Sequence, residues 1–283
     1  QFRAMGYTTR AYHDHTYTYY SRNKSHPNLG YDYKGVGNGL NIKVMWPESD
    51  VDMMNATLDT VLADEYFMTY YLTVSGHLEY NFFGNAMCMR NKAAVEGLDL
   101  PEAARAYLAC NIELDKAIGV LLQKLEETGH DKDTVIMLAP DHYPYGLDTE
   151  SLNALAGKQL DQFSLYQSCF LIWSADMEGP VVIDKPVSSL DILPTVSNLF
   201  DLEYDSRLMM GADMLSDTQS PVIFQDHSWL TAYGCYDAAK DHYTSFIDTG
   251  DDENYVQSMN YQVDQKFTYS KLILRKDLYR QIW

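Results

Sequence analysis

The sequence has few cysteines, few basic residues and no long apolar run, and each scarcity excludes a class of protein. Its four cysteines are widely spaced with no Cys-x-x-Cys pair, which excludes a zinc knuckle and a dense disulfide scaffold. Only 21 lysines and arginines stand against 40 aspartates and glutamates, a formal net charge of −19, so nucleic acid is not an expected partner. No apolar run approaches the roughly 18 residues of a membrane span. What is left is an acidic globular chain.

The length and composition are sufficient for a full hydrophobic core. At 283 residues and 46% hydrophobic, we expect one large domain. Residues 1–215 are its expected core, and residues 216–283 its C-terminal strands and helices. The first residues, Gln1 to Gly6, resemble the last turn of a helix closing on a glycine. We therefore expect the chain to be a piece of a longer protein.

The clearest pattern lies between residues 101 and 142. Apolar residues at helical spacing run from Pro101 to Gly129, which predicts the longest helix of the chain. The apolar run after Thr134 predicts a buried strand that ends at Asp141 and His142. With the strand before it, this helix forms a strand, helix, strand unit with a right-handed crossover as the default.

Further strands and helices are predicted along the rest of the chain. We expect strands over 7–13, 65–74, 168–173 and 220–224, edge strands over 231–248, a helix beginning at Ser49-Asp50, a turn-rich stretch over 30–39, a helix over 187–199 and two helical stretches over 254–280. The runs near Tyr70, Leu138 and Ile172 lack clean alternation, so they are expected to be central strands covered on both faces. The predicted fold class is α/β, a mixed and mostly parallel sheet with helices on both faces.

Three of the predicted strands end at histidines. Ligand sites of open α/β sheets lie outside the carboxyl ends of the strands, so Asp141-His142, His77 and His13 are site candidates. An aspartate beside an imidazole predicts half of a divalent-metal site. Each candidate also has an interpretation without a role in the site. Asp141 and His142 could be a hydrogen-bonded pair in a loop, and His77 could be a histidine in a turn. His15 or His26 could take the role proposed for His13. Asp226-His227 repeats the pattern after a shorter strand.

Several pieces, in this order, resemble one family. They are Tyr12-His13, Tyr20-Ser-Arg22, Ser75-Gly-His77, the long helix, the run from Thr134 to Tyr143, and the run from Ser189 to Thr195. Together they look like the extracellular catalytic domain of lipoteichoic acid synthases, phosphoglycerol transferases of the sulfatase and alkaline phosphatase superfamily. The resemblance covers most of the chain, to about Leu215, and implies that superfamily's fold.

The resemblance also implies roles for single residues. Asp141 and His142 match the family's Asp-His pair that binds a divalent metal, Mn²⁺ or Mg²⁺, with Zn²⁺ or Ca²⁺ as alternatives. His77 matches the histidine near the reacting phosphate, and His13 matches a second catalytic histidine. The substrate-binding positions are Arg22, which grips the phosphate, Tyr20, where the synthases have tryptophan, and His15, where an acidic or amide residue is expected.

One part of the family's site has no counterpart here. The metal-binding glutamate and the threonine nucleophile precede the segment that matches Gln1, so the partner we expect is the missing N-terminal segment. No cysteine has the context of a sulfatase formylglycine, and Thr195 falls in a predicted helix. By itself, we expect the chain to be inactive.

The resemblance implies a metal-dependent enzyme that moves glycerol phosphate from phosphatidylglycerol to polyglycerol phosphate or a glycolipid acceptor. It would work on the extracellular face of the cell membrane, tethered by upstream transmembrane segments. The alternatives are a sulfatase or a phosphoethanolamine transferase of the same superfamily, or a non-catalytic binding module.

Overall fold

The computed structural model describes residues 1–247 and 250–282. The chain divides into two compact units, Gln1–Glu178 and Gly179–Trp283, which are described separately below. The first unit holds all seven residues proposed for the site. The division expected from the sequence, after residue 215, stays a prediction.

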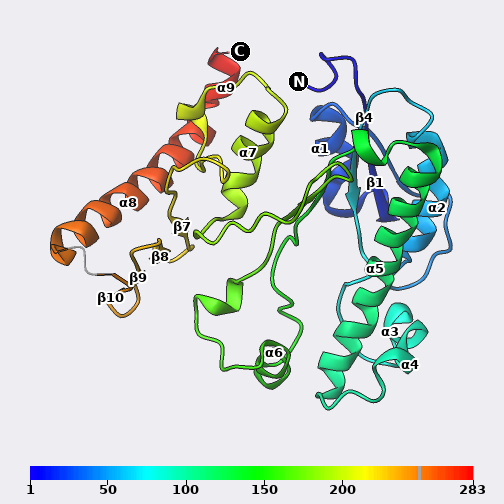
Figure 1. Ribbon diagram of the computed structural model, residues 1–283, viewed down its shortest axis with the longest axis horizontal. Coiled ribbons are helices and arrows are strands. Elements are labelled where there is room, and N and C mark those ends of the chain that lie inside the picture. Colours follow the sequence, from blue (N-terminus) through cyan, green and yellow to red (C-terminus); the bar gives the residue numbers. More distant parts are fainter. Residues whose placement is uncertain (248–249, 283) are drawn as a thin grey trace. The chain divides into compact units, whose positions relative to one another are not determined.

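A four-stranded parallel sheet organises the first unit. Its strands are β1 (Thr8–Thr16), β2 (Asp32–Val36), β3 (Gly39–Leu40) and β4 (Phe67–Leu72), in the order β3-β2-β1-β4. Every neighbouring pair is parallel. β1 lies beside β4 (Figure 1), and its position between β2 and β4 brings the carboxyl ends of these three strands together.

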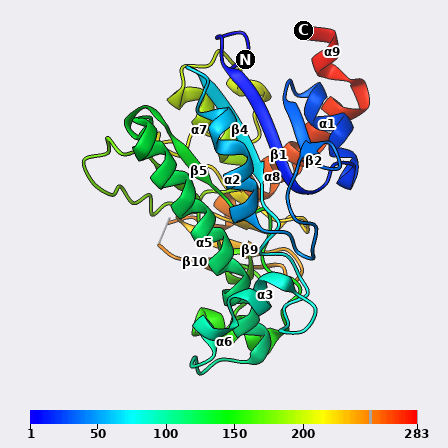
Figure 2. The same ribbon diagram turned by 90° about the vertical axis from the view of Figure 1, so that its right-hand side faces the viewer.

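Helices cover the two faces of this sheet. On one face, α2 (Asp50–Val61) and α5 (Glu102–Thr128) pack over a core that contains Tyr12, Met53 and Leu125. On the other side, α1 (Arg22–Asn28) contacts β2 (Figure 2). Burying a methionine or leucine side chain contributes about 1.5–3 kcal/mol, so this core holds the sheet against α2 and α5. The predicted fold class, a mostly parallel sheet with helices on both faces, is confirmed.

Local sequence signals set the ends of the two long helices as predicted. Ser49 caps α2, because its side chain accepts a hydrogen bond from the Asp52 amide. Gly129 ends α5 in the left-handed conformation, with a φ of 74° that a glycine adopts without strain.

The glycine-rich stretch over 30–39, which the sequence predicted to be turn-rich, contains β2 and the start of β3. Gly35 explains the difference, because a Cβ atom there would lie 2.9 Å from the Tyr17 Cα and 3.2 Å from the His15 carbonyl oxygen. Glycine thus lets β2 approach β1 beside its irregular end, where the register shifts between His13 and Thr16.

The expectation of three central strands was wrong in detail. The strand at Tyr70, β4, is an edge strand of the parallel sheet. The strands at Leu138 and Ile172 are β5 (Ile136–Leu138) and β6 (Leu171–Trp173), which pair antiparallel with each other in a separate ladder. Within the described residues, β5 therefore does not join β4 through the predicted crossover. An apolar run indicates burial, but it carries no information about which strand it will pair with.

Shorter helices complete the first unit. They are α3 (Ala86–Arg90), α4 (Lys92–Val95) and α6 (Thr149–Ala156), with single 3₁₀ turns at Tyr19–Ser21, Asp131–Asp133 and Ser164–Tyr166. α3 and α4 both contact α5, so the segment between β4 and α5 is fixed against the long helix.

The second unit has an antiparallel sheet and one long helix. Its elements are 3₁₀ turns at Ser189–Asp191 and Ser206–Leu208, α7 (Ile192–Leu199), β7 (Val222–Ile223), β8 (Trp229–Leu230), β9 (Gly234–Asp237), β10 (His242–Ser245), α8 (Asp252–Lys276) and α9 (Leu278–Ile282). The strand order is β10-β9-β8-β7. Trp229 of β8 packs with Met259 and Val263 of α8 in the core of this unit. Among the described residues, no helix is both long and apolar enough to span a bilayer.

Candidate active site

The carboxyl end of β1 supplies two histidines to one face of the sheet and a buried aspartate to the other. Successive side chains of a strand point to opposite faces. Tyr12 and Asp14 face α2, because Tyr12 belongs to the core there and Asp14 interacts with Asp50 of α2. His13 and His15 therefore point to the face on which α1 lies, and their ring centres are 6.0 Å apart.

His13 holds an arginine in place. Its Nδ1 lies 2.9 Å from the Leu72 carbonyl oxygen, which accepts a hydrogen bond, and its Nε2 lies 3.0 Å from a terminal guanidinium nitrogen of Arg22. Arginine only donates, so Nε2 is the acceptor and the ring is neutral. Burial, and then the nearby Arg22 charge, lower the pKa of His13 to about 4. His13 is thus a neutral ring that orients Arg22.

Two tyrosines surround the same guanidinium. Its central carbon lies 5.5 Å from the Tyr19 ring centre and 5.6 Å from that of Tyr20, within cation–π range. Tyr20 and Ser21 have φ values of 49° and 57°. Two consecutive non-glycine residues in the left-handed region store strain, a feature that clusters at functional sites. Tyr20 is 79% exposed, so its ring presents an aromatic surface to solvent beside Arg22.

His77 is fixed by the loop that follows β4. The Leu78 carbonyl oxygen lies 3.0 Å from His77 Nδ1 and accepts a second hydrogen bond, at 3.2 Å, from the Trp46 indole. The His77 and Trp46 ring centres are 4.9 Å apart. With Nδ1 donating to a carbonyl, Nε2 is the nitrogen left for chemistry.

Trp46 links His77 to His15. Its ring centre lies 5.2 Å from that of His15, and His15 in turn lies 5.0 Å from the ring of Tyr19. The structure thus joins the five proposed catalytic and substrate-binding residues, His13, His15, Tyr20, Arg22 and His77, through Tyr19 and Trp46. These two connecting residues could not be recognised from the sequence, because aromatic side chains more often pack in a core than contact a ligand.

The acidic residues behind these histidines were also missed. Glu48 places both carboxylate oxygens 3.0 Å from His15 Nδ1. Asp50 accepts hydrogen bonds from the amides of Val74 and Ser75, at 3.0 and 3.1 Å, and from the Ser75 hydroxyl. Asp50 therefore fixes the chain two residues before His77. Glu48 precedes α2 and Asp50 begins it. From the sequence, a carboxylate at a helix N-terminus is expected to be solvated and to interact favourably with the helix dipole.

Asp14 completes a buried acidic group next to Asp50. Neither of its carboxyl oxygens has a hydrogen-bond partner within the described residues. Burial first, and then the neighbouring Asp50 and Glu48, raise the pKa of Asp14 well above its ordinary value. The charged form of this carboxyl is therefore disfavoured in the folded protein.

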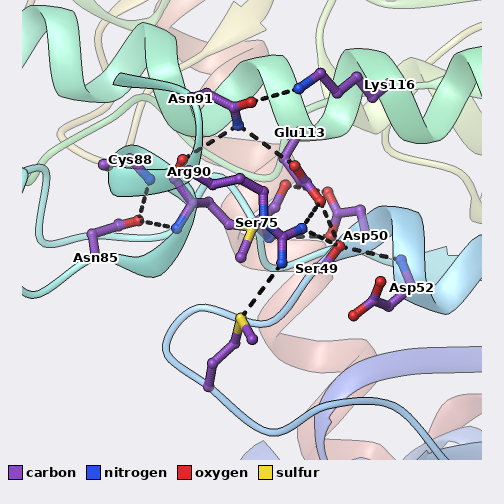
Figure 3. A network of polar contacts seen from close by, with 12 residues as sticks. Ser49, Asp50, Asp52, Ser75, Asn85, Cys88, Arg90, Asn91, Glu113 and Lys116 are labelled. Atoms are coloured by element: carbon purple, nitrogen blue, oxygen red, sulfur yellow. Dashed lines mark hydrogen bonds and ion pairs between the residues drawn. The ribbon is translucent and has the colours of Figure 1, made fainter. Parts of the chain in front are cut away.

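A polar network fixes the base of α2 against α5 and α3 (Figure 3). Glu113 of α5 is buried and accepts hydrogen bonds from the Ser49 hydroxyl and, at 2.5 Å, from the Arg90 guanidinium. Asn91 joins through its amide, which lies 3.5 Å from Glu113 and accepts at 2.6 Å from Lys116. The network stabilises the turn that carries Glu48 and Asp50.

The proposed metal ligands lie on an exposed loop. His142 Nε2 and Asp141 Oδ1 are 3.5 Å apart, and the Asp141 side chain is 84% exposed. His142 Nδ1 lies 2.8 Å from the Tyr143 carbonyl oxygen, which leaves Nε2 as the ligand atom. The two donors converge and suit a divalent cation as a half-site. Within the described residues no group of three or more such side chains is placed to hold a metal.

The same loop reaches the residues beside His77. A Cβ atom at Gly146 would lie 3.0 Å from the Leu78 Cβ and 3.3 Å from the Tyr80 ring. The Tyr145 ring lies 4.7 Å from that of His142. The loop therefore runs from the metal candidates to the segment that carries His77.

Two other candidates belong to the second unit. His227 Nδ1 donates to the Asp264 carboxylate at 2.6 Å, and its ring stacks on that of Phe267 with the ring centres 4.2 Å apart, so the Asp226-His227 pattern has a structural explanation. Thr195 lies buried in α7, where its hydroxyl donates to the Asp191 carbonyl at 2.6 Å and accepts from the Met214 amide at 2.9 Å. This hydroxyl is engaged in packing the second unit.

Sequence comparison identifies the family. Residues 1–202 match the sequence pattern of the Sulfatase family. The chain belongs to this family. It is similar in sequence and in fold to lipoteichoic acid synthases, as its motifs indicated.

The relatives agree with this assignment. A lipoteichoic acid synthase of Staphylococcus saprophyticus subsp. saprophyticus is 23% identical over 240 residues, which cover 80% of this chain and 36% of that protein. This chain therefore spans about a third of that relative. The crystal structure of the lipoteichoic acid synthase LtaP from Listeria monocytogenes aligns with a TM-score of 0.78 at 19% identity, over 97% of this chain and 72% of that one.

A second solved structure shares the fold. It is a protein of the alkaline phosphatase superfamily from Vibrio parahaemolyticus, with a TM-score of 0.67 at 14% identity, over 98% of this chain and 67% of that one.

Proposed function

We propose that this chain is part of the catalytic domain of a metal-dependent transferase that moves glycerol phosphate from phosphatidylglycerol to polyglycerol phosphate or a glycolipid. The observation that carries the proposal is the Arg22 guanidinium, held by His13 Nε2 at 3.0 Å and flanked by two tyrosine rings. A planar guanidinium matches phosphate geometry. Because His13 is neutral, the charge of Arg22 remains available to a phosphate.

His77 is the proposed proton donor. Its Nδ1 is engaged by Leu78, so Nε2 can hold the proton that the departing diacylglycerol oxygen needs. Tyr20 provides an exposed aromatic surface for the head group. Tyr19 and Trp46 restrict the orientation of the neighbouring rings.

Asp141 and His142 would hold part of a metal site. The bound cation, Mn²⁺ or Mg²⁺ with Zn²⁺ or Ca²⁺ as alternatives, would stabilise negative charge on phosphoryl oxygens. We propose that the remaining ligand and the nucleophile come from another segment of the same protein. We also propose that upstream transmembrane segments tether the domain at the extracellular face of the membrane.

The same residues would also serve a second candidate function within the family. A sulfatase or a phosphoethanolamine transferase would use the same arginine and metal. The resemblance of the ordered motifs to phosphoglycerol transferases favours the first proposal.

The test is diacylglycerol release from labelled phosphatidylglycerol by the full-length protein, compared with Arg22→Lys and His77→Asn. We expect His77→Asn to lower kcat by about 10²–10⁴ and Arg22→Lys to raise KM, because the arginine contacts the phosphate in both ground and transition states. Residues 1–283 alone should release none. Release of inorganic sulfate from an aryl sulfate, with no diacylglycerol formed, would favour the sulfatase instead.

A further inference from the structure

His15 differs from its neighbours in how its ring nitrogens are used. His13 has both nitrogens engaged, by Leu72 and Arg22. His15 has only Nδ1 engaged, by the Glu48 carboxylate. Within the described residues, no hydrogen bond to His15 Nε2 is formed, and the side chain is 20% exposed. His15 therefore presents one free nitrogen.

The partner of His15 is unusual in its burial. The Glu48 side chain is 1% exposed, and both of its oxygens lie 3.0 Å from the same nitrogen. Glu48 also lies immediately before Ser49, the N-cap of α2, where the positive end of the helix dipole stabilises a carboxylate. Burying a carboxylate costs folding free energy unless a donor satisfies it. Among the described residues Glu48 has one side-chain partner, His15, so His15 must donate to it.

This arrangement decides the tautomer of His15. A carboxylate accepts hydrogen bonds, so Nδ1 carries the proton and the neutral ring has its lone pair on Nε2. The Tyr19 and Trp46 rings, whose centres lie 5.0 and 5.2 Å from that of His15 in T-shaped arrangements, keep the imidazole from turning. Nε2 is then an oriented acceptor next to the ring of His13, which holds Arg22.

We propose that Glu48 is a positioning residue that makes His15 Nε2 an acceptor for a hydroxyl group of the molecule whose phosphate binds Arg22. The inference rests on the proposed function and deepens it, because it names what distinguishes a polyol phosphate from a simple alkyl phosphate. The imidazole accepts this hydroxyl through Nε2, and a buried acid fixes its orientation.

The first test measures the tautomer in residues 1–283. Two-dimensional NMR of ¹⁵N-labelled histidine rings at pH 8 should show the proton of His15 on Nδ1. Glu48→Leu should remove this preference, whereas Glu48→Gln should keep it, because the amide oxygen still accepts from Nδ1. Glu79→Gln, an exposed acid near His77, is the matched control and should change nothing. A wild-type ring protonated on Nε2 would overturn the proposal.

The second test compares two ligands by calorimetry, glycerol 1-phosphate and propyl phosphate, which lacks the hydroxyls. We expect wild type and Glu48→Gln to prefer glycerol 1-phosphate by roughly 3- to 10-fold, the value of one net hydrogen bond. His15→Phe keeps the aromatic contacts and should bind both ligands equally, as should Glu48→Leu.

The outcomes separate the two proposals. Equal affinities in wild type, each lost in Arg22→Leu, would overturn the role of the pair and leave the phosphate site intact. A preference that survives His15→Phe would also overturn it. Absence of any Arg22-dependent binding would overturn the proposed substrate site, and the hydroxyl contact with it.

Discussion

Replacing Asp14 by asparagine should stabilise the protein at neutral and alkaline pH. Asp14 is fully buried, no donor reaches either of its oxygens within the described residues, and Asp50 and Glu48 are its acidic neighbours. Asparagine has nearly the same shape, carries no charge and brings an amide that can donate to a carboxylate. An unsatisfied buried group costs roughly 1–3 kcal/mol, and we expect a gain of that size at pH 8.

The sign of the pH dependence follows from the raised pKa of Asp14. A carboxyl whose pKa in the folded protein exceeds its ordinary value of 3.8 binds its proton more tightly when folded. Its contribution to the free energy of unfolding is complete below pH 3.8 and is lost as pH rises through the folded pKa. Wild type should therefore lose stability relative to Asp14→Asn as pH rises, and the two should differ little at pH 3.5.

Urea denaturation followed by circular dichroism at pH 3.5, 6 and 8 measures this difference. Asp50→Asn is the informative control, because Asp50 accepts three hydrogen bonds, from Val74 and Ser75, and its loss should destabilise at every pH. A variant Asp14→Asn that is less stable than wild type at pH 8, or a difference that does not change with pH, would refute the reasoning.

Three further outcomes are expected. Glu113→Ala should destabilise by about 1–3 kcal/mol, because it removes the acceptor shared by Ser49, Arg90 and Asn91, whereas the exposed Glu126→Ala on the same helix should stay within about 0.5 kcal/mol; similar urea midpoints would count against the network. Gly119→Ala, at an exposed helix position where a Cβ meets nothing within 4 Å, should stabilise by about 0.5–1 kcal/mol, and a lowered melting temperature would contradict this. Calorimetry of residues 1–283 should show Mn²⁺ binding that is weaker than micromolar and disappears in Asp141→Ala. With only two protein ligands, water must fill the remaining coordination positions of the ion. Tight binding that survives the substitution would exclude these ligands.

Features that depend on a single helix or strand could be predicted from the sequence. Ser49 and Gly129 mark the ends of their helices because a hydroxyl cap and a left-handed glycine act locally. His13 and His77 could be singled out because each lies near the carboxyl end of an apolar strand, and the geometry of parallel sheets brings such ends together.

Contacts between segments far apart in the chain could not be predicted from the sequence. Glu48 and His15 are 33 residues apart, and nothing in a Pro-Glu-Ser-Asp stretch distinguishes a buried acid from a solvated one. The pairing of β5 with β6 depends on which edge each strand meets, and their apolar residues fit either neighbour. The strands formed by residues 32–40 were hidden because glycine signals turns, whereas Gly35 serves close backbone approach.

The binding of a glycerol phosphate at Arg22 is the central claim, and the histidine NMR signals of residues 1–283 test it directly. Glycerol 1-phosphate should shift the ring signals of His13, His15 and His77 in a saturable manner and leave those of His227 and His242 in place, and Arg22→Leu should abolish the shifts. Shifts confined to other histidines, or unchanged shifts in Arg22→Leu, would contradict the account.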